Sequence, residues 1–463
     1  MVSICVNTQS SPIRQLRDVS DEPRSGIISL DNLREGLDFR YNAGGVTRMI
    51  HPMISHGVNS NIFSKVDWVA LAAGDQIKID MGDYILHGVS LPEKTLNRYA
   101  EHKEAIWDSM HGRKARFTRA NFHAYLEYNR KVAGKIEELN ASKEFDILYI
   151  HDFQQLPQAK MLGNFAPTMF RWHIPFYADF CSTQMREILS SFLEQYTSVI
   201  VSTERYADEL RRIGFKGQLR HSYPFVDDRS IVGHPASELR SFREKWGIGE
   251  DDKVILCVAR MTPSKNQAVI IRAMKKILRS FPDTKLLLVG NGSFSNSSKG
   301  GLGLSKSMTW TNHLKYLISR NGLDDHVIMT GYLDTKDIFR AFEICDIFIL
   351  PSIVEGFGLV VIEAWHYKKP VIVSNGSGVA ERVVEGENGY TFDPRKPRDL
   401  AEKVTAVLAN PSFAHQMGEN GHLIAGEHGL QEGLKNEMSI IEHVIELWQT
   451  DESSDTKMDF AEI

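Results

Sequence analysis

The stretch Pro351-Ser-Ile-Val-Glu355-Gly-Phe-Gly-Leu-Val-Val-Ile-Glu363 places two carboxylates eight positions apart across a turn that contains two glycines. The apolar residues just before it, 346–350, predict a buried strand, and the residues after Gly358 predict a helix. Glu355 is therefore expected on the loop at the carboxyl end of a strand, and Glu363 about one turn inside the next helix. The glycines let the backbone approach a ligand closely, and a helix start offers free N–H groups to an anion. This arrangement suits a sugar, a diphosphate and a ribose in one line, which is the layout of a sugar nucleotide.

Each half of this motif also has an ordinary structural explanation. Glu355 could cap a turn, and Glu363 could be a surface residue of the helix. The surrounding sequence favours a ligand site, because residues 259–265 follow another predicted strand, lead into a helix and carry Arg260 and Lys265. Both cations can reach a diphosphate, the arginine as a planar fork and the lysine as a point charge.

Length and composition indicate a globular protein of two or three domains. The chain has 463 residues, of which 42% are hydrophobic and 24% charged,. Its net charge of −5 argues against a nucleic-acid partner,. The four cysteines form no CxxC pair or His/Cys cluster, so neither a metal site nor a disulfide framework is expected,. The sequence has no basic N-terminal region followed by an apolar stretch and no apolar run near about 18 residues. We therefore expect a cytoplasmic protein that does not span a membrane, and peripheral membrane contact is left open.

From about residue 250 onward, short apolar runs alternate with helical patterns. Near-continuous apolar strands separated by helices predict a parallel sheet covered on both faces, and ligands of such sheets bind beyond the carboxyl ends of the strands. The predicted strands are residues 253–258, 285–289, 327–329, 346–350, 370–373 and 390–392, and the predicted helices are residues 267–281, 311–320, 336–343, 359–367 and 378–384.

The first half is less regular, and residues 10–40 are expected to be an irregular insertion. Two of its predicted strands end in chemically active side chains, His151-Asp152 and Arg171-Trp-His173. An acid and an imidazole on neighbouring strand ends are candidates for lining a cleft, although a core or capping histidine is the plainer explanation of His173. The predicted strands are residues 146–152, 168–172 and 198–202, and the helices are residues 117–139 and about 46–56.

The residues of the second half carry a family resemblance. Its Glu355-x7-Glu363 motif and its Arg260–Lys265 pair resemble those of the retaining glycosyltransferases with two Rossmann domains, the GT-B architecture (GT4-like). The first half resembles trehalose-6-phosphate synthases, and the matching residues there are Gly44-Gly45-Val46, Tyr99, Trp107, His111, Asn129, Ile150-His-Asp152, His173-Ile-Pro-Phe176 and Tyr223-Pro224.

This resemblance implies an α/β protein of the GT-B class, with two Rossmann-like doubly wound domains facing a central cleft. The expected domains are an N-terminal acceptor-side domain over residues 1–230 and a C-terminal nucleotide-sugar-binding domain over residues 231–435. For the final helix, residues 436–463, packing back on the N-terminal domain is one option.

The resemblance also implies roles for single residues. His173, Asp152 and Glu355 would form the catalytic group around the donor sugar. Tyr99 and Trp107 would belong to the acceptor pocket. The donor-binding residues would be Arg260 and Lys265 at the diphosphate, Glu363 at the ribose hydroxyls, and Gly45, Gly356, Phe357, Gly358, Leu359 and Val360 along the donor.

The chain departs from the trehalose-6-phosphate synthase pattern in three places. Glu355 stands where those enzymes carry an aspartate. The spacing from Tyr99 to Trp107 is one residue shorter. Residues 1–8 lack the arginine expected to hold the acceptor phosphate, so that Arg14, Arg17 or another cation is left to take its place.

The resemblance implies a retaining, metal-independent hexosyltransferase. The expected donor is a nucleoside-diphosphate sugar, with UDP-glucose favoured, and the expected acceptor is a sugar phosphate, with glucose 6-phosphate giving trehalose 6-phosphate. The alternatives are the same chemistry on free glucose, a glycerate derivative or a lipid, and a non-catalytic protein that binds sugar nucleotides. A dehydrogenase is disfavoured because no G-x-G-x-x-G follows a first strand. No separate cofactor is expected, and a homo-oligomer is compatible with the sequence.

Overall fold

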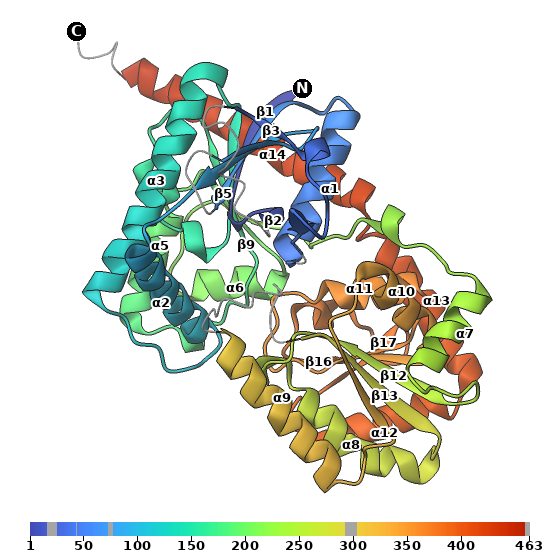
Figure 1. The fold of residues 1–463 in the computed structure, drawn as a ribbon. Helices are drawn as coiled ribbons and strands as arrows, with labels where there is room; N and C mark the ends of the chain where they lie inside the picture. Colours follow the sequence, from blue (N-terminus) through green and yellow to red (C-terminus); the bar gives the residue numbers. More distant parts are fainter. Residues whose placement is uncertain (16–25, 43, 73–76, 292–302, 459–463) are drawn as a thin grey trace. The chain divides into compact units, whose positions relative to one another are not determined.

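The computed structural model describes residues 1–15, 26–42, 44–72, 77–291 and 303–458. It divides into two compact α/β units, coloured mainly blue to green and green to orange in Figure 1. The first unit comprises Met1–Tyr223 together with Leu434–Ile463, and the second unit comprises Pro224–Gly433.

The second unit is built on a parallel sheet with the strand order β14-β13-β12-β15-β16-β17. The chain adds strands outward from β12 on one side and then returns to its other side with β15, so the strand order reverses between these two strands. In doubly wound sheets, ligands bind outside the carboxyl ends of the strands at this reversal. The strands are β12 Lys253–Val258, β13 Thr284–Val289, β14 Val327–Gly331, β15 Ile347–Leu350, β16 Val371–Ser374 and β17 Gly389–Phe392.

Both faces of this sheet are apolar and covered by helices. Ile255 and Cys257 of β12 belong to one core with α8, α9 and α12, whereas the intervening Leu256 is equally buried on the other face. Continuous burial of this kind produces strands that are apolar throughout. The helices are α7 Ala236–Lys245, α8 Gln267–Ser280, α9 Gly303–Arg320, α10 Thr335–Ile344, α11 Leu359–His366, α12 Pro397–Leu408 and α13 Pro411–Gly426, with 3-10 turns η4 Asp228–Ser230, η5 Pro263–Lys265 and η6 Gly378–Arg382.

The first unit contains a nine-stranded sheet with the order β11-β10-β9-β8-β1-β5-β7-β6-β3. Its pairs are parallel except for β6 with β7, and the strand order reverses between β1 and β8. The strands are β1 Val2–Ser10, β3 Ile28–Ser29, β5 Phe63–Leu71, β6 Lys78–Asp80, β7 Ile85–Val89, β8 Ile147–His151, β9 Thr168–Trp172, β10 Ser198–Val201 and β11 Leu219–His221, and a separate antiparallel ribbon pairs β2 Ile13–Gln15 with β4 Phe39–Tyr41.

Side chains alternate across the strands of the first unit. Leu148 and Ile150 of β8 face the core that contains α2 and α3, and Tyr149 between them contacts α14 on the opposite face. The helices are α1 Gly45–Asn59, α2 Glu93–Met110, α3 Arg119–Lys143, α4 Gln158–Met161, α5 Thr183–Leu193, α6 Glu204–Arg212 and α14 Leu430–Met458, with 3-10 turns η1 Leu30–Asn32, η2 Phe153–Gln155 and η3 Ala178–Phe180.

The helix α14 begins in the second unit, and its residues from Leu434 onward belong to the first unit. Its Glu437 is fully buried there and accepts hydrogen bonds from Arg171 of β9, Tyr149 of β8 and Ser222. A second donor group of Arg171 contacts the carbonyl oxygen of Ser222 at 2.8 Å. This buried network, hereafter the Arg171–Glu437 network, fastens the C-terminal helix to the sheet of the first unit.

Most strands predicted for the second half are confirmed, with residues 253–258 reproduced as β12. Two helix predictions there need correction. The helix expected from residue 311 already begins at Gly303, and the segment expected as a helix over residues 378–384 is the 3-10 turn η6. In the first half, the region expected to be irregular, residues 10–40, contributes β2, β3 and most of β4.

Candidate functional site

The two predicted donor motifs meet where the strand order of the second unit reverses. Arg260 and Lys265 lie on the loop that follows β12, and Glu355 lies on the loop that follows the neighbouring strand β15. The loops are joined by two hydrogen bonds: the Ile353 amide donates to the Ser264 carbonyl at 2.8 Å, and the Asn266 side chain donates to the Pro351 carbonyl at 3.3 Å. The fold therefore presents both motifs as one surface at the ligand-binding edge of the sheet.

Lys265 and Glu355 form the central contact of this surface. The ammonium group of Lys265 donates to Glu355 Oε2, and the Ser352 hydroxyl donates to the same oxygen at 2.9 Å. Burial raises the pKa of Glu355, but Lys265, Ser352 and Arg260 outweigh that effect and hold it below its usual value. Glu355 is therefore a carboxylate at neutral pH and can accept hydrogen bonds from sugar hydroxyls.

The loop that carries Arg260 is fixed by close backbone packing. Gly290 has a φ of +131°, and a Cβ atom at this position would lie 2.2 Å from the Ala259 carbonyl oxygen. The side chain of Gln267 donates to the Arg260 carbonyl at 2.8 Å, and Trp310 of α9 donates to Gln267 at 2.9 Å. The turn after β13, the start of α8 and the helix α9 thus define the path of the backbone at Arg260.

The glycine-containing turn after Glu355 leads directly into α11. Gly358 has a φ of +113°, and a Cβ atom there would lie 2.6 Å from the Leu350 side chain. The turn places the amides of Leu359 and Val360 in the first turn of α11, where helical N–H groups have no partner within the helix,. Gly356 and Phe357 are buried, and the Val379 amide donates to the Phe357 carbonyl at 2.9 Å.

Glu363 lies on the second turn of α11 and is only 1% exposed. Its surface-helix explanation is therefore wrong. A carboxylate at this depth requires hydrogen-bond or ion-pair partners in place of water.

In the first unit, Asp152 follows β8, where the strand order of that sheet reverses next to β1. Its φ of +71° is unusual for a residue other than glycine, and such backbone conformations cluster at functional sites,. The His173 amide, just after β9, donates to Asp152 Oδ1 at 3.4 Å. The structure thus brings together the acid and the imidazole that were predicted on neighbouring strand ends.

His151 is a third member of this cluster. Its Nδ1 lies 3.0 Å from His173 Nε2, and the two rings are stacked with centroids 5.3 Å apart. One of these nitrogens must carry the shared proton. Burial lowers the pKa of both histidines well below the usual value, with the nearby Arg171 adding to the effect. His173 is therefore a neutral imidazole whose tautomer is coupled to that of His151.

The pKa of Asp152 moves in the opposite direction from that of Glu355. Burial raises it to about 7, against the lowering effect of backbone amides at Phe153, His173 and Ile174. This carboxyl group therefore changes its protonation state in the physiological range, which is typical of functional sites.

The remaining predicted residues of the first unit differ in their accessibility. Gly45 is the exposed first residue of α1, and Gly44 caps that helix. Tyr99 is 1% exposed and packs in the core against Tyr128, with ring centroids 4.6 Å apart. Its side chain lies in the core of the first unit, and its assignment to the acceptor pocket stays a prediction.

Trp107 is partly buried and lies near the cluster formed by Asp152, His151 and His173. Its ring stacks on His111 with centroids 4.1 Å apart and lies 6.3 Å from Phe153, the residue after Asp152. Of the two predicted acceptor residues, Trp107 is thus the one that the fold leaves near Asp152.

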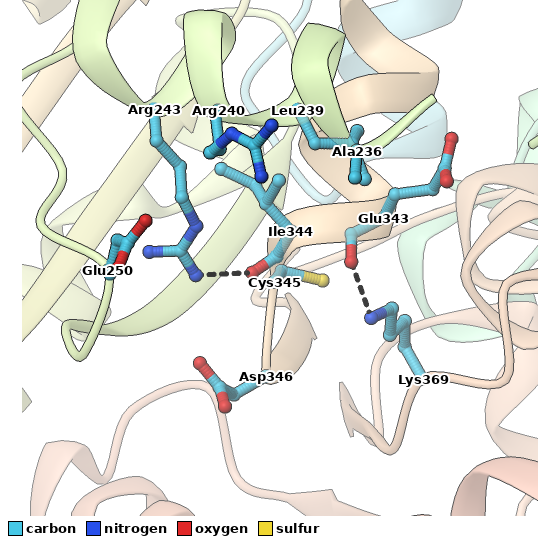
Figure 2. Close-up of a pocket in the computed structure, with 10 residues that line it drawn as sticks. All are labelled: Ala236, Leu239, Arg240, Arg243, Glu250, Glu343, Ile344, Cys345, Asp346 and Lys369. Atoms are coloured by element: carbon cyan, nitrogen blue, oxygen red, sulfur yellow. Dashed lines mark hydrogen bonds between the residues drawn. The ribbon is translucent and has the colours of Figure 1, made fainter. Parts of the chain in front are cut away.

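A surface pocket of about 460 Å³ lies elsewhere in the second unit, beside the amino end of β15 (Figure 2). Two of its cations already bind backbone carbonyls: Arg243 contacts Ile344 at 3.4 Å, and Lys369 contacts Glu343 at 2.7 Å. Because these cations join structural elements and the pocket lies at the edge opposite the donor motifs, it is not the candidate site.

Within the described ranges, no group of three or more His, Cys, Asp or Glu side chains is arranged to hold a metal ion. Among the helices whose residues are described, none combines the length and the apolar character needed to cross a bilayer.

Sequence reasoning missed two partners of the site, Ser352 and Ser377. Ser352 lies three residues before Glu355, within a motif that drew attention for other residues. Ser377, which forms an isolated parallel bridge with Glu355, follows the next strand and gave no local signal.

Comparison with known proteins adds two family matches. Residues 240–423 match the family described as glycosyl transferases group 1, and residues 93–208 match the family described as trehalose synthase, N-terminal domain. Together they cover the donor motifs of the second unit and the His151–His173 region of the first unit.

Two relatives are similar in sequence. The GDP-mannose-dependent alpha-(1-6)-phosphatidylinositol monomannoside mannosyltransferase of Mycolicibacterium smegmatis is 28% identical over 245 residues, which cover 51% of this chain and 56% of that protein. The chain thus spans little more than half the length of this relative. Trehalose synthase of Thermococcus litoralis is 25% identical over 330 residues, which cover 70% of this chain and 75% of that protein.

A solved structure supports the fold. The Escherichia coli protein described as trehalose-6-phosphate, bound with UDP-2-fluoro glucose, has a TM-score of 0.74 at 15% identity and covers 95% of this chain and 98% of that one. At this identity the likeness concerns the fold alone. The chain carries a glycosyltransferase group 1 domain and a trehalose synthase N-terminal domain on a GT-B fold.

Proposed function

We propose that this glycosyltransferase is a retaining, metal-independent hexosyltransferase that uses a nucleoside-diphosphate sugar, with UDP-glucose as the favoured donor. The favoured acceptor is a sugar phosphate, glucose 6-phosphate, which would give trehalose 6-phosphate. The observation that carries the proposal is the convergence of Arg260, Lys265 and Glu355 at the strand-order reversal of the second unit.

The second unit supplies groups that match each part of such a donor. Arg260 and Lys265 provide positive charge for the diphosphate, and the first amides of α11 add the positive end of a helix,. Glu355, kept ionised by Lys265, would accept hydrogen bonds from sugar hydroxyls. The buried Glu363 would accept them from the ribose.

In the proposed reaction, the bond between the sugar C1 and the diphosphate oxygen breaks while an acceptor hydroxyl bonds to C1 on the same face. The hydroxyl proton passes to the departing diphosphate. The negative charge that develops on the leaving group is stabilised by groups already in place, Arg260 and Lys265, and such preorganised stabilisation is a large contribution to catalysis. Neutral His173 and the Asp152 carboxyl group are proposed to position the donor sugar.

The donor and acceptor need a direct test, because the names of the relatives include GDP-mannose as well as trehalose. We suggest a screen for nucleoside diphosphate release with UDP-glucose, ADP-glucose, GDP-glucose and GDP-mannose. Each donor is combined with glucose 6-phosphate, glucose, glycerate and a lipid extract. Release with UDP-glucose and glucose 6-phosphate alone supports the full proposal, release with another pair changes the substrates, and release with no pair supports a non-catalytic binding protein.

We expect kcat/KM to rise by up to about tenfold between pH 6 and pH 8 through ionisation of Asp152. Its pKa of about 7 makes it mainly protonated at pH 6 and mainly a carboxylate at pH 8. Only the carboxylate accepts hydrogen bonds from sugar hydroxyls with both oxygens. His151 and His173 remain neutral throughout this range because their pKa values are lowered. The measurement is the pH profile of kcat/KM, which reports groups of the free enzyme.

The matched variant is Asp152→Asn, which keeps the shape of the side chain and cannot ionise. Its profile should lose the step near pH 7. An unchanged step in this variant would remove Asp152 from the assignment.

A further inference from the structure

The surface pocket drawn in Figure 2 is a second concave site of the second unit. One wall is α7, and the opposite wall combines residues 343–346, where α10 leads into β15, with Lys369. Its volume of about 460 Å³ is within the range of small-molecule sites, about 300–1,000 Å³,. This pocket, hereafter the α7 pocket, lies before β15, whereas the donor motif with Glu355 follows that strand.

Two acids of the α7 pocket are held by groups outside its wall. Asp346 accepts from the Val254 amide at 2.8 Å and from the Lys253 ammonium group at 3.5 Å. Glu343 accepts from the ring of His234 and, at 3.2 Å, from its backbone amide. Neither carboxylate therefore pairs with a cation that lines the pocket.

Two cations of the wall are anchored to groups that carry no charge. Arg243 donates to the Ile344 carbonyl at 3.4 Å, and Lys369 donates to the Glu343 carbonyl at 2.7 Å. Neither cation has an ion-pair partner in the part of the chain that the structure describes. A carbonyl group fixes the position of a cation but leaves its net charge in place, so both side chains present positive charge that is already oriented.

Arg240 of α7 is a third cation, and it is the one most free to meet a ligand. Its side chain is exposed, and no hydrogen bond or ion pair joins it to another residue of the described ranges. Figure 2 shows its guanidinium group directed toward Ile344. Glu250, the remaining acid of the wall, is exposed and likewise has no partner among the described residues. An incoming anion would therefore meet three cations and a single free carboxylate.

Apolar side chains line the remainder of the α7 pocket. Ile344 and Cys345 are 7% and 2% exposed, and Leu239 of α7 is partly exposed. Small-molecule sites typically combine such an apolar surface with a few polar groups that fix the orientation of the ligand. Guanidinium groups bind phosphate and carboxylate oxygens in bidentate fashion. The lining thus fits a small molecule with an anionic group and an apolar body.

We propose that the α7 pocket binds a small organic anion, whose phosphate or carboxylate group contacts Arg240, Arg243 and Lys369. The ligand would lie at the edge of the sheet opposite the donor motifs, so it would be an effector of the protein and not a substrate. The inference goes beyond the proposed function and does not depend on it.

The test measures binding of inorganic phosphate, citrate and glucose to the full chain at constant ionic strength. Calorimetry gives the affinity, and hydrogen exchange locates the ligand. We expect an anion, but not glucose, to slow exchange in α7 and over residues 343–346. Slowing by phosphate alone indicates a phosphorylated ligand, slowing by citrate alone indicates a carboxylate, and slowing by both indicates a site that accepts either group.

Arg240→Gln should weaken this binding about tenfold or more, the loss expected for a charge-assisted hydrogen bond. Because Arg240 has no described partner to lose, the variant should melt with the natural chain when no anion is present. Arg272→Gln is the matched control, since Arg272 is an exposed arginine of α8 outside the pocket that also has no partner among the described residues.

Lys265→Ala separates the α7 pocket from the donor motifs, which could also attract an anion. This variant should leave the slowed exchange of α7 unchanged. Absence of slowed exchange in α7 with both anions would overturn the proposal, as would undiminished binding in Arg240→Gln or an equal loss in Arg272→Gln. None of these measurements needs a donor or turnover, so their outcome is independent of the proposed reaction.

Discussion

Replacing Lys265 with alanine is expected to lower kcat by about 10²–10³-fold, a loss of about 2–4 kcal/mol of transition-state stabilisation. Two effects act together at this residue. The departing diphosphate loses a cation that the fold holds in place, and Glu355 loses the partner that keeps it ionised despite its burial. The measurement is steady-state release of nucleoside diphosphate with the donor and acceptor identified by the screen.

Arg260→Ala tests the diphosphate contact without breaking the Lys265–Glu355 pair. We expect a loss of similar size in kcat, because the guanidinium supplies charge to the same leaving group. The matched control is Lys276→Ala, which removes an α8 lysine that pairs with Glu402 on the surface and should leave turnover unchanged. Near-natural turnover in both Lys265→Ala and Arg260→Ala would contradict the assignment of the diphosphate site.

The two motifs proposed to bind the donor could be recognised from sequence because each is encoded locally. Arg260 and Lys265 lie five positions apart on one loop, and Glu355 and Glu363 belong to one strand-turn-helix segment. Parallel strands with continuous apolar runs identify the sheet, and their carboxyl ends identify the ligand edge. What the sequence could not provide was the pairing of the two loops, since the strand order decides that β12 and β15 are neighbours.

Among the strands of the first unit that were not predicted, β5 and β7 share a physical reason. β5 contains Asp67, which interrupts its apolar run, yet the side chain of Asp67 is fully buried. His87 of β7 lies 2.6 Å from it, and Lys143 at the end of α3 lies 2.7 Å from it. A charged residue is found inside a sheet only when such partners exist, and both come from distant parts of the chain.

The residues proposed for the acceptor side were harder to predict, because their neighbours in the fold also come from distant parts of the chain. Tyr99 has the spacing of a binding residue along its helix, but its neighbours Tyr125 and Tyr128 come from α3 and close the core around it.

Replacing Glu437 with alanine is expected to destabilise the first unit by about 3–5 kcal/mol, because it leaves the charge of Arg171 buried without a partner. Both side chains are 0% exposed, so water cannot compensate the loss. Tyr149 and Ser222 would lose their hydrogen-bond acceptor at the same time. Urea unfolding, followed by tryptophan fluorescence and by hydrogen exchange of β8 and β9, measures the change.

Two further variants separate loss of the charge pair from general damage to the core. Arg212→Ala removes a surface arginine that pairs with Glu209 and Asp179, and it should leave the unfolding transition where it is,. The double variant Arg171→Met, Glu437→Leu removes both buried charges, and it should recover most of the stability lost in Glu437→Ala, because replacing a whole buried pair with apolar groups is often neutral. Arg171 lies two residues before His173 and is paired in register with His151. Recovery of stability without recovery of turnover would therefore show that Arg171 positions His151 and His173 as well as holding α14. A Glu437→Ala variant that unfolds with the natural chain would contradict the structural role of the Arg171–Glu437 network.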